Sequence, residues 1–489
     1  MSGAVREESV DVRRRDEAVA GTVQRWLGNP LSRALLRLVT GRTEHGNRLN
    51  IALKKYAGEE VPEDLGFRDK LASMLIGFVI GRGSESFGVS PEEMKETLRD
   101  PIIRRGIANV IEGIAQYGIQ RPYTSVAPFL VVWDYTRLCN LRCKHCYEDA
   151  SPDADTSEEL TTEEAKQVID EFKEAGIVAI AFSGGEPLSR DDFFEVAKYA
   201  KDQGFFVSIA TNGTLITREV ANKLKDVVEY AEISLDGFEE THDEFRGIEG
   251  CWKRTCEGIR NSVEAGIDTC VALTATHYNL DEISELIEFA EKDLGARKAI
   301  IFNYIPVRKG REIIDEDLTP QERWGLLEDL YSKLLDEDNP MTLYSTAPQY
   351  AAVSWEFAHG PAIATHFTNE AAMQALQGRT KTLAQFLGGC GAGRLYCALE
   401  PNGDVEPCVF IPIKVGNIRE QSLREIWQNS EVLDKIRDRE HLEGCSDCDY
   451  KYICGGCRAR AYAYYGDLQG PDPSCPENEN YWKELKNKT

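Results

Sequence analysis

The sequence of 489 residues predicts an α/β protein built on a partial (β/α)6 barrel of the TIM type, with a helical N-terminal region and a Cys-rich C-terminal domain. Three observations support this prediction. Short apolar segments alternate with amphipathic helical segments between residues 128 and 310. Residues 1–127 show only helical periodicity. Residues 389–480 hold eight of the 14 cysteines among many Gly and Pro residues.

The N-terminal region reads as a set of helices without a metal-ligand pattern. In its first helical stretch apolar side chains recur every three or four residues beside several arginines; they are Trp26, Leu27, Leu31, Leu35, Leu36 and Val39. Such a stripe favours packing on the rest of the protein, and peripheral association with an acidic membrane surface is the alternative. A second helix over 71–79 is expected to end at Gly81 and Gly83, and a third follows Pro101.

The predicted barrel strands are six apolar runs, which cover residues 129–133, 177–182, 205–210, 230–235, 268–274 and 298–304. Helices of roughly ten to fifteen residues lie between them. The first of these helices begins at Thr161, whose hydroxyl can form a capping box with Glu164, and ends before Gly176. Because buried strands that alternate with helices need crossover connections, we expect a parallel sheet. Six units are too few for a closed eightfold barrel, so a partly open one is predicted, with functional groups on the loops after the strands.

Two segments follow the predicted barrel. Residues 311–388 read as a mainly helical bridge. Residues 389–480 contain little that could form a core, so this segment is expected to need bound metal in order to fold. In an intracellular protein, grouped cysteines of this kind indicate metal sites rather than disulfides.

Composition and charge exclude several classes of protein. The 57 basic and 82 acidic residues give a net charge of −25, which argues against a nucleic-acid partner because such binding needs a basic face. A hydrophobic content of 42% is too high for a disordered chain. The charged N-terminus lacks the apolar core of a secretory signal, and the longest apolar stretch, residues 71–81, is about half as long as a membrane span. We therefore expect a cytoplasmic protein without a membrane span.

A group of three cysteines follows the first predicted strand in the segment DYTRLCNLRCKHCYEDA. Cys139, Cys143 and Cys146 have C-x3-C-x2-C spacing, so their thiolates can bind three irons of a [4Fe–4S] cluster and leave the fourth iron open. An open coordination position is typical of a reactive metal site. A structural zinc site is the alternative, but zinc would prefer a fourth local ligand, and His145 lies between two of the cysteines.

Further motifs follow the next three strands, namely FSGGEPL at 182–188, ATNGTL at 210–215 and SLDG at 234–237. Each of them alone is also an ordinary turn sequence. Their occurrence in order on consecutive βα units instead indicates a ligand site at the strand ends. The glycines of the first motif permit close approach of the backbone to a ligand, and Glu186 can accept a hydrogen bond from an ammonium group. A hydroxyl and a carboxylate at alternating positions, as in Ser234 and Asp236, can bind a ribose diol.

With these motifs the chain resembles the radical S-adenosylmethionine (SAM) superfamily, in which this cysteine spacing lies at the end of the first barrel strand. The resemblance implies that the three cysteines bind a [4Fe–4S] cluster and that the strand-end motifs contact SAM through Gly184, Gly185, Glu186, Pro187, Thr211, Asn212, Ser234 and Asp236. The family usually has an adenine-contacting aromatic residue immediately before the third cysteine. Here His145 holds that position and Tyr147 follows Cys146, and an imidazole can also stack on adenine.

The late cysteines resemble the SPASM extension, which carries auxiliary [4Fe–4S] clusters. By that resemblance one ligand set consists of Cys390, Cys408 and Cys457, with Cys397 as the expected fourth member. The other set consists of Cys445, Cys448, Cys454 and Cys475. A zinc ribbon built on the two CxxC pairs is the alternative, but it leaves several late cysteines unexplained. The remaining cysteines fit no ligand spacing and are expected to be packed thiols; they are Cys251, Cys256 and Cys270.

The resemblance implies an oxidoreductase or lyase in which SAM is reductively cleaved to a 5′-deoxyadenosyl radical that abstracts hydrogen from a substrate carbon. Two auxiliary clusters would carry an electron to or from the substrate. A low-potential protein such as ferredoxin or flavodoxin is the expected electron donor. The sequence assigns no residue as catalytic acid, base or hydrogen donor.

In its fine detail the chain resembles radical SAM enzymes of alternative haem and haem d1 biosynthesis. The segments that carry this resemblance are TRLCNLRCKHCY, FSGGEPLSRDDFFE, ATNGTLIT, SLDGFEETHDEFRG and CGGCRARAYAYYGDLQGPDPSC. The two-residue gap between Cys454 and Cys457 agrees with that group, although nearly all matches are cofactor-binding parts. A tetrapyrrole substrate with propionate side chains would need cationic anchors, and the candidates are Arg246, Arg308, Arg311 and Arg394.

Other substrates and other classes of protein stay open. A maturase that modifies peptides commonly has a small winged helical domain with an edge strand, whereas the N-terminal region shows no clear β-hairpin. A lipid or quinone substrate would agree with the arginine-flanked stripe near Trp26. An iron–sulfur electron carrier would have no use for the GGEP, TNGT and SLDG motifs, and a non-catalytic scaffold would contain zinc without sulfide.

Overall fold

A computed structural model describes residues 30–44, 46–86, 90–336, 338–358 and 385–487 of the chain. Its centre is a sheet of ten strands in the order β12-β11-β10-β3-β4-β5-β6-β7-β8-β9. Every neighbouring pair from β10 to β9 is parallel, and only β11 and β12 pair in the antiparallel sense. The predicted α/β class with a partial barrel is thereby confirmed.

The six predicted strands form the middle of this sheet and follow one another in chain order. They are β3 (Leu130–Thr136), β4 (Ala179–Gly184), β5 (Phe206–Thr211), β6 (Tyr230–Ser234), β7 (Asp268–Ala275) and β8 (Lys298–Asn303). Both faces of these strands are covered, as their continuous apolar runs predict for a parallel sheet. β3 is buried along its whole length, so its polar residues Asp134 and Thr136 lie inside the protein.

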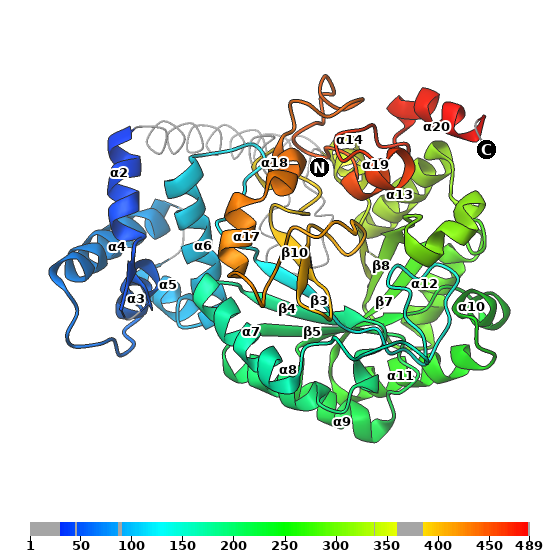
Figure 1. The fold of residues 1–489 in the computed structure, drawn as a ribbon, viewed down its shortest axis with the longest axis horizontal. Helices are drawn as coiled ribbons and strands as arrows, with labels where there is room; N and C mark the ends of the chain where they lie inside the picture. Colours follow the sequence, from blue (N-terminus) through cyan, green and yellow to red (C-terminus); the bar gives the residue numbers. More distant parts are fainter. Residues whose placement is uncertain (1–29, 45, 87–89, 337, 359–384, 488–489) are drawn as a thin grey trace.

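Helices connect the strands and cover the outer face of the sheet, as α7, α8 and α9 do along the bottom of the view in Figure 1. They are α7 (Thr162–Ala175), α8 (Phe193–Asp202), α9 (Arg218–Val227), α10 (Glu239–Arg246), α11 (Cys251–Ala265) and α12 (Ile283–Lys292), with the 3-10 turn η1 (Pro187–Ser189) after β4. The predicted capping box of α7 is present between Thr161 and Glu164. The helix ends at Gly176, which adopts φ +88° and closes it in the left-handed conformation.

The sheet extends beyond the six predicted strands at both edges. Residues 311–388, predicted as mainly helical, contribute β9 (Thr342–Ser345) as well as η2 (Arg308–Glu316, which starts just before them), α13 (Pro320–Leu335) and α14 (Gln349–Ala358). At the other edge β10 (Tyr396–Leu399) pairs with β3, although more than 250 residues separate them in the sequence. The C-terminal segment therefore shares the core of the barrel instead of folding only around metal.

The remaining C-terminal elements are β11 (Asp404–Glu406), β12 (Gly416–Asn417), α17 (Leu423–Asn429), α18 (Glu431–Arg437), α19 (Arg458–Tyr465), η3 (Pro476–Asn478) and α20 (Glu479–Lys486). α18, α19 and α20 lie across the top of the view in Figure 1, opposite α7–α9.

Alternate residues of each strand face opposite sides of the sheet. Ala231 and Ile233 of β6 pack in the cluster shared with the outer helices, whereas Tyr230 packs in a separate inner cluster with Cys270 and Ala272 of β7. The inner side is the lumen of the barrel.

The N-terminal region is helical as predicted, with α2 (Pro30–Val39), α3 (Arg48–Tyr56), α4 (Phe67–Ser86), α5 (Pro91–Thr97) and α6 (Pro101–Tyr117). The prediction that the second helix ends at Gly81 and Gly83 is wrong, because α4 continues to Ser86. A small antiparallel pair of strands, β1 (Arg42–Thr43) and β2 (Gly46–Asn47), was also not predicted.

The N-terminal helices lie beside the barrel and are tied to it through α6 (Figure 1). Arg105 donates hydrogen bonds to the backbone carbonyls of Ile177 and Gln203, and Asn109 donates to that of Ala127. Trp26 and Leu27, the first two residues of the predicted apolar stripe, lie outside the described residues. None of the helices in the described ranges has the length and apolar character that crossing a membrane requires.

Candidate active site

The loop that follows β3 brings the three predicted cluster ligands to one cavity at the open end of the barrel. Cys139, Cys143 and Cys146 all line this cavity. The loop is fixed by hydrogen bonds from the N–H groups of Arg142 and Lys144 to the carbonyls at the end of α10. Burial and the neighbouring thiols raise the pKa of Cys139 to about 12 and that of Cys146 to about 11. Thiolates at these positions therefore require a bound cation, and three converging thiolates fit three corners of a [4Fe–4S] cluster.

The GGEP loop after β4 packs directly against the cysteine loop. The N–H of Gly185 donates to the carbonyl of Thr136 at 2.7 Å, and the N–H of Glu186 donates to that of Leu138 at 2.9 Å. A Cβ atom at Gly185 would lie 2.4 Å from the Leu138 carbonyl oxygen, so only glycine fits. Gly184 and Gly185 also line the cavity, as expected for residues that bring backbone close to a ligand.

Glu186 has a different surrounding from the predicted one. Its fully buried carboxylate accepts hydrogen bonds from the Thr211 hydroxyl, from the Asn212 N–H and from the Leu188 N–H. Burial raises the pKa of Glu186 to about 7 against the opposing effect of these bonds. Neither Glu186 nor Pro187 lines the cavity, because the side chain turns inward to join the second and third strand-end loops. The contact of these two residues with SAM therefore stays a prediction.

The other strand-end residues divide into two groups. Thr211, Asn212 and Ser234 line the cavity beside the cysteines, as predicted. Asp236 does not, because its carboxylate is fully buried and accepts hydrogen bonds from Arg246 at 2.5 Å and from the Thr274 N–H. Arg246 lines the cavity in its place, with Nη1 3.7 Å from Cys143 Sγ. Asp236 thus positions this arginine, and its contact with the ribose of SAM stays a prediction.

Both aromatic candidates for adenine line the cavity, but their surroundings differ. The ring of His145 stacks on Phe245 of α10 with 4.0 Å between centroids, and burial keeps its pKa well below the usual value. The hydroxyl of Tyr147 makes hydrogen bonds with Ser183 at 2.8 Å and Asp134 at 3.2 Å, and its ring lies edge-on to Phe410. His145 is thus already stacked on a protein side chain, whereas Tyr147 connects the cavity to the group of carboxylates described next.

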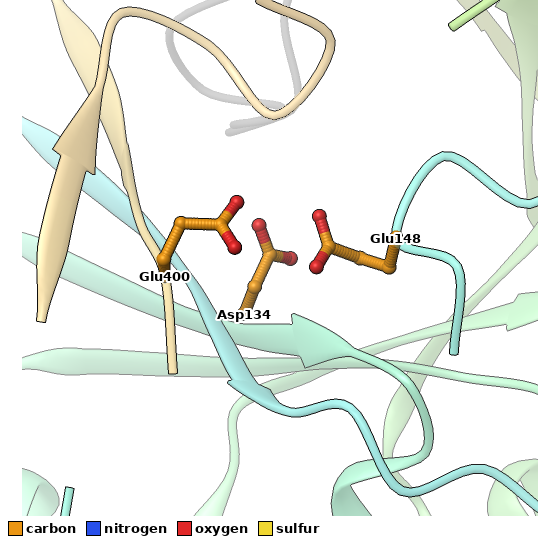
Figure 2. A group of neighbouring side chains, drawn as sticks. All are labelled: Asp134, Glu148 and Glu400. Atoms are coloured by element: carbon orange, nitrogen blue, oxygen red, sulfur yellow. The ribbon is translucent and has the colours of Figure 1, made fainter. Parts of the chain in front are cut away.

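Behind Tyr147 lies a buried acidic cluster that the sequence did not indicate. Figure 2 shows the carboxylates of Asp134, Glu148 and Glu400 pointing toward one another from β3, from the cysteine loop and from the segment after β10. Oxygens of the three side chains all lie within 4.8 Å of one another. Arg308 joins them, with 2.8 Å from Nη1 to Glu148 and with Nη2 at 3.0 Å from Glu400 and 3.5 Å from Glu406.

The charges of this cluster do not balance when every carboxyl is ionised. Arg308 and Arg137, which lies 3.0 Å from Glu400, face four carboxyl groups. Burial and then the Glu400 charge raise the pKa of Glu148 to about 8 and that of Glu406 to about 9. At neutral pH the cluster therefore retains protons, and guanidinium groups already occupy both oxygens of Glu400. Arg308 also has φ +45°, an uncommon conformation for a non-glycine residue that these contacts hold in place.

Of the first auxiliary set, the structure brings three cysteines together. Cys390, Cys408 and Cys457 pack in one inner cluster. Burial and then the charge of Cys390 raise the pKa of Cys408, and burial followed by the charges of Asp472, Cys390 and Cys408 raises the pKa of Cys457. Cys397 is not among them. It belongs to the outer core cluster, since on β10 it faces away from Tyr396, whose hydroxyl lies 3.1 Å from Cys408 Sγ. The expectation that Cys397 is the fourth ligand is corrected by this alternation.

The second auxiliary set is complete. Its four cysteines line one cavity together with residues of α13 and α14; they are Cys445, Cys448, Cys454 and Cys475. Between the two sets lies Asp472, whose fully buried carboxylate accepts hydrogen bonds from the Cys457 N–H at 2.6 Å and from Gln349 at 2.7 Å. After burial, the charge of Asp472 raises the pKa of Cys457 in one set and the pKa of Cys475 in the other. Asp472 is a second functional candidate without a local sequence signal.

The remaining sequence candidates do not line the cavity. Cys251, Cys256 and Cys270 are buried among apolar side chains, as expected for packed thiols. Arg394 is fully buried and donates to backbone carbonyls that include those of Leu387 and Cys390, and Arg311 donates to that of Ala463. Among the four arginines proposed as propionate anchors, only Arg246 lines the main cavity in the described part of the chain.

Comparison with known proteins agrees with this geometry. Residues 133–290 match the radical SAM superfamily, and residues 390–449 match SPASM, an iron–sulfur cluster-binding domain. The AdoMet-dependent heme synthase of Methanosarcina barkeri is 39% identical over 353 residues, which are 71% of this chain and 96% of that protein. The chain belongs to the radical SAM superfamily. As a radical SAM enzyme with a SPASM domain, it uses SAM as cosubstrate and binds one SAM-associated [4Fe–4S] cluster and auxiliary clusters.

Other relatives and structures show how widely the scaffold is shared. The mycofactocin maturase MftC of Mycolicibacterium smegmatis is 31% identical and covers 72% of this chain, with 83% of that protein covered. The crystal structure of Streptococcus suis SuiB bound to S-adenosylmethionine has a TM-score of 0.61 at 16% identity and covers 87% of this chain and 92% of SuiB. At that identity the likeness concerns the fold of radical SAM proteins alone.

Proposed function

We propose that this radical SAM enzyme is an oxidoreductase or lyase that removes hydrogen from a side-chain carbon of a carboxylate-bearing tetrapyrrole. The observation that carries the substrate class is the 39% identity to a heme synthase along 96% of that protein, together with two further heme synthases at 33% identity. An Fe-coproporphyrin III synthase is 32% identical over 87% of its length. These names describe the relatives, and the shared length supports transfer of the substrate class to this chain.

In this proposal Cys139, Cys143 and Cys146 hold the cluster that binds SAM, and bound SAM supplies a 5′-deoxyadenosyl radical. Gly184, Gly185, Thr211, Asn212, Ser234 and Tyr147 form the surrounding wall and orient the cofactor. Arg246 lies beside Cys143 and balances thiolate charge there. The aromatic side chains of Phe302, Tyr304 and Phe410 line the same cavity and exclude water from it, which protects a reactive radical.

Two auxiliary clusters would receive the electron that the substrate releases. One ligand set consists of Cys390, Cys408 and Cys457. The other set consists of Cys445, Cys448, Cys454 and Cys475. A three-cysteine set leaves one coordination position without a protein thiolate. A cytoplasmic ferredoxin or flavodoxin is the electron donor that suits low-potential clusters.

The direct test uses iron coproporphyrin III as substrate. Reduced, reconstituted protein is incubated anaerobically with SAM, with and without the porphyrin, and 5′-deoxyadenosine and porphyrin masses are followed. We expect the porphyrin to raise 5′-deoxyadenosine formation several-fold and its own mass to decrease in proportion. If the porphyrin mass stayed unchanged and the porphyrin did not increase the formation of 5′-deoxyadenosine, the proposed substrate would be contradicted.

A peptide substrate is the second candidate, because a mycofactocin maturase is 31% identical to this chain. The small β1–β2 pair in the N-terminal region also removes part of the sequence argument against a peptide partner. A gene for a short precursor peptide beside the gene of this protein, and mass loss from that peptide in the same assay, would favour the maturase.

A further inference from the structure

One carboxyl group lies inside the barrel without an evident structural task. Glu232 is the middle residue of β6, and the neighbours on either side of it, Ala231 and Ile233, belong to the outer core. Strand alternation therefore directs Glu232 to the lumen together with Tyr230 and Ser234. All three line the same cavity as the cysteines of the SAM site, with Glu232 deeper in the barrel than Ser234.

The surroundings of Glu232 are small or apolar. Ala181 of β4, Ser208 of β5, Ala272 of β7 and Phe302 of β8 line the same cavity. Within the described ranges no hydrogen bond or ion pair holds the Glu232 carboxyl group, and burial alone raises its pKa to about 8. Glu232 is partly exposed to the cavity, so its carboxyl group is open to a polar group of a ligand that enters there.

Other titratable groups face this part of the lumen, and none neutralises Glu232. On the same strand lies Tyr230, and on β7 lies Cys270, which is paired in register with Glu232. The next strand contributes Lys298, whose Nζ lies 2.6 Å from Asp268 and 5.8 Å from the Tyr230 ring centroid. Lys298 is thus paired with Asp268 and not with Glu232. With a pKa of about 8, Glu232 is mainly protonated at neutral pH.

We propose that Glu232 is a substrate-binding residue whose carboxyl group donates a hydrogen bond to a carboxylate oxygen of the substrate deep in the barrel. This inference rests on the proposed function, since it assigns a position to one carboxylate of the tetrapyrrole. A protonated carboxyl group is a donor, and a carboxylate is the acceptor that forms the strongest hydrogen bond with it. The small side chains of Ala181, Ser208 and Ala272 leave space beside Glu232 for a flexible propionate arm.

The test compares wild-type protein with the E232Q and E232L variants. Binding of iron coproporphyrin III is titrated anaerobically by its absorption between about pH 6.5 and pH 9.5, around the raised pKa, and its tetramethyl ester serves as a probe without carboxylates. Leucine removes the donor, so E232L is expected to bind the porphyrin at least tenfold more weakly at neutral pH. Glutamine keeps an N–H donor, so E232Q is expected to bind within a few-fold of wild type.

The pH dependence separates this role from a structural one. Wild-type affinity is expected to fall as the pH rises through about 8, because an ionised Glu232 cannot donate and repels a carboxylate. E232Q has no proton to lose and is expected to bind independently of pH, and the ester is expected to bind wild type and E232L equally. A SAM-dependent change in the cluster spectrum, retained by both variants, verifies that they are folded.

Two failures are distinguishable. If wild type binds the porphyrin and E232L binds it equally well, or if E232Q keeps the wild-type pH profile, the role of Glu232 is overturned while the proposed substrate stands. If wild type does not bind the porphyrin at any pH, the proposed substrate and the carboxylate assignment are both overturned.

Discussion

Replacement of Cys139, Cys143 or Cys146 by Ala is expected to abolish formation of 5′-deoxyadenosine from SAM. Each substitution removes one of three thiolates that converge on the cavity, so a cluster that can chelate SAM no longer has its protein ligands. The measurement is 5′-deoxyadenosine release under reducing, anaerobic conditions, together with iron and sulfide analysis. We expect each variant to lose about four iron atoms per chain and to keep the auxiliary iron, because the C-terminal ligand sets lie elsewhere.

Cys251→Ala is the matched control for this experiment. Cys251 packs in the same small apolar cluster as Cys139, but it is not a predicted ligand and its Sγ lies 3.2 Å from Asp243. The control is expected to retain its iron and to cleave SAM. Cleavage of SAM by any of the three ligand variants would contradict the assignment, and loss of iron by the control would show that these substitutions act through packing.

Arg308→Met is expected to destabilise the protein by about 3–5 kcal/mol, because it leaves Glu148, Glu400 and Glu406 as buried carboxyl groups without this partner. The measurement is the free energy of unfolding by denaturant of the cluster-loaded protein. Lys309→Met is the control, since Lys309 is the next residue and a half-buried cation whose Nζ donates to the Arg142 carbonyl and, within the described ranges, pairs with no carboxylate. It is expected to change stability by less than about 0.5 kcal/mol.

The pH dependence of this destabilisation follows from the direction of the pKa shifts. In the folded protein the pKa values of Glu148 and Glu406 lie near 8 and 9, above the ordinary value of 4.5. Their raised values favour the folded state below about pH 4.5, and that contribution is lost as the pH rises toward 8–9. Without Arg308 these pKa values rise further, so Arg308→Met is expected to lose more stability at pH 8 than at pH 5. If Arg308→Met and Lys309→Met had the same free energy of unfolding at pH 8, the role of Arg308 would be contradicted.

Much of the fold could be predicted from the sequence, because buried parallel strands and amphipathic helices have distinct local patterns. Each predicted strand begins and ends within two residues of β3–β8, except at the end of the first, where the polar residues Asp134, Tyr135 and Thr136 continue the strand. Both β9 and β10 escaped prediction because they are short and lie in segments whose neighbours in the sequence are helices or cysteine loops. Their place in the sheet depends on pairing with strands far away in the chain.

The candidate site was predictable where its ligands share one loop and unpredictable where distant segments meet. The cysteine triad and the glycine motifs have fixed spacings, and the structure places most of them around one cavity. The partners of Glu186 and Asp236 are internal, which spacing alone does not reveal. Cys397 has a plausible spacing but the wrong strand face, and the cluster around Arg308 joins residues more than 250 positions apart.

The measurement that tests the central claim most directly is a titration of the reduced protein with SAM, followed by electron paramagnetic resonance. Because the auxiliary clusters contribute signals of their own, wild type is compared with Cys143→Ala, which lacks only a ligand of the SAM-binding cluster. In wild type we predict that SAM changes the signal of one cluster and that the change saturates as SAM is added. In Cys143→Ala we predict that this cluster signal is absent and that SAM changes nothing in the spectrum. A wild-type spectrum that SAM leaves unaltered would contradict the assignment of the cavity as a SAM site.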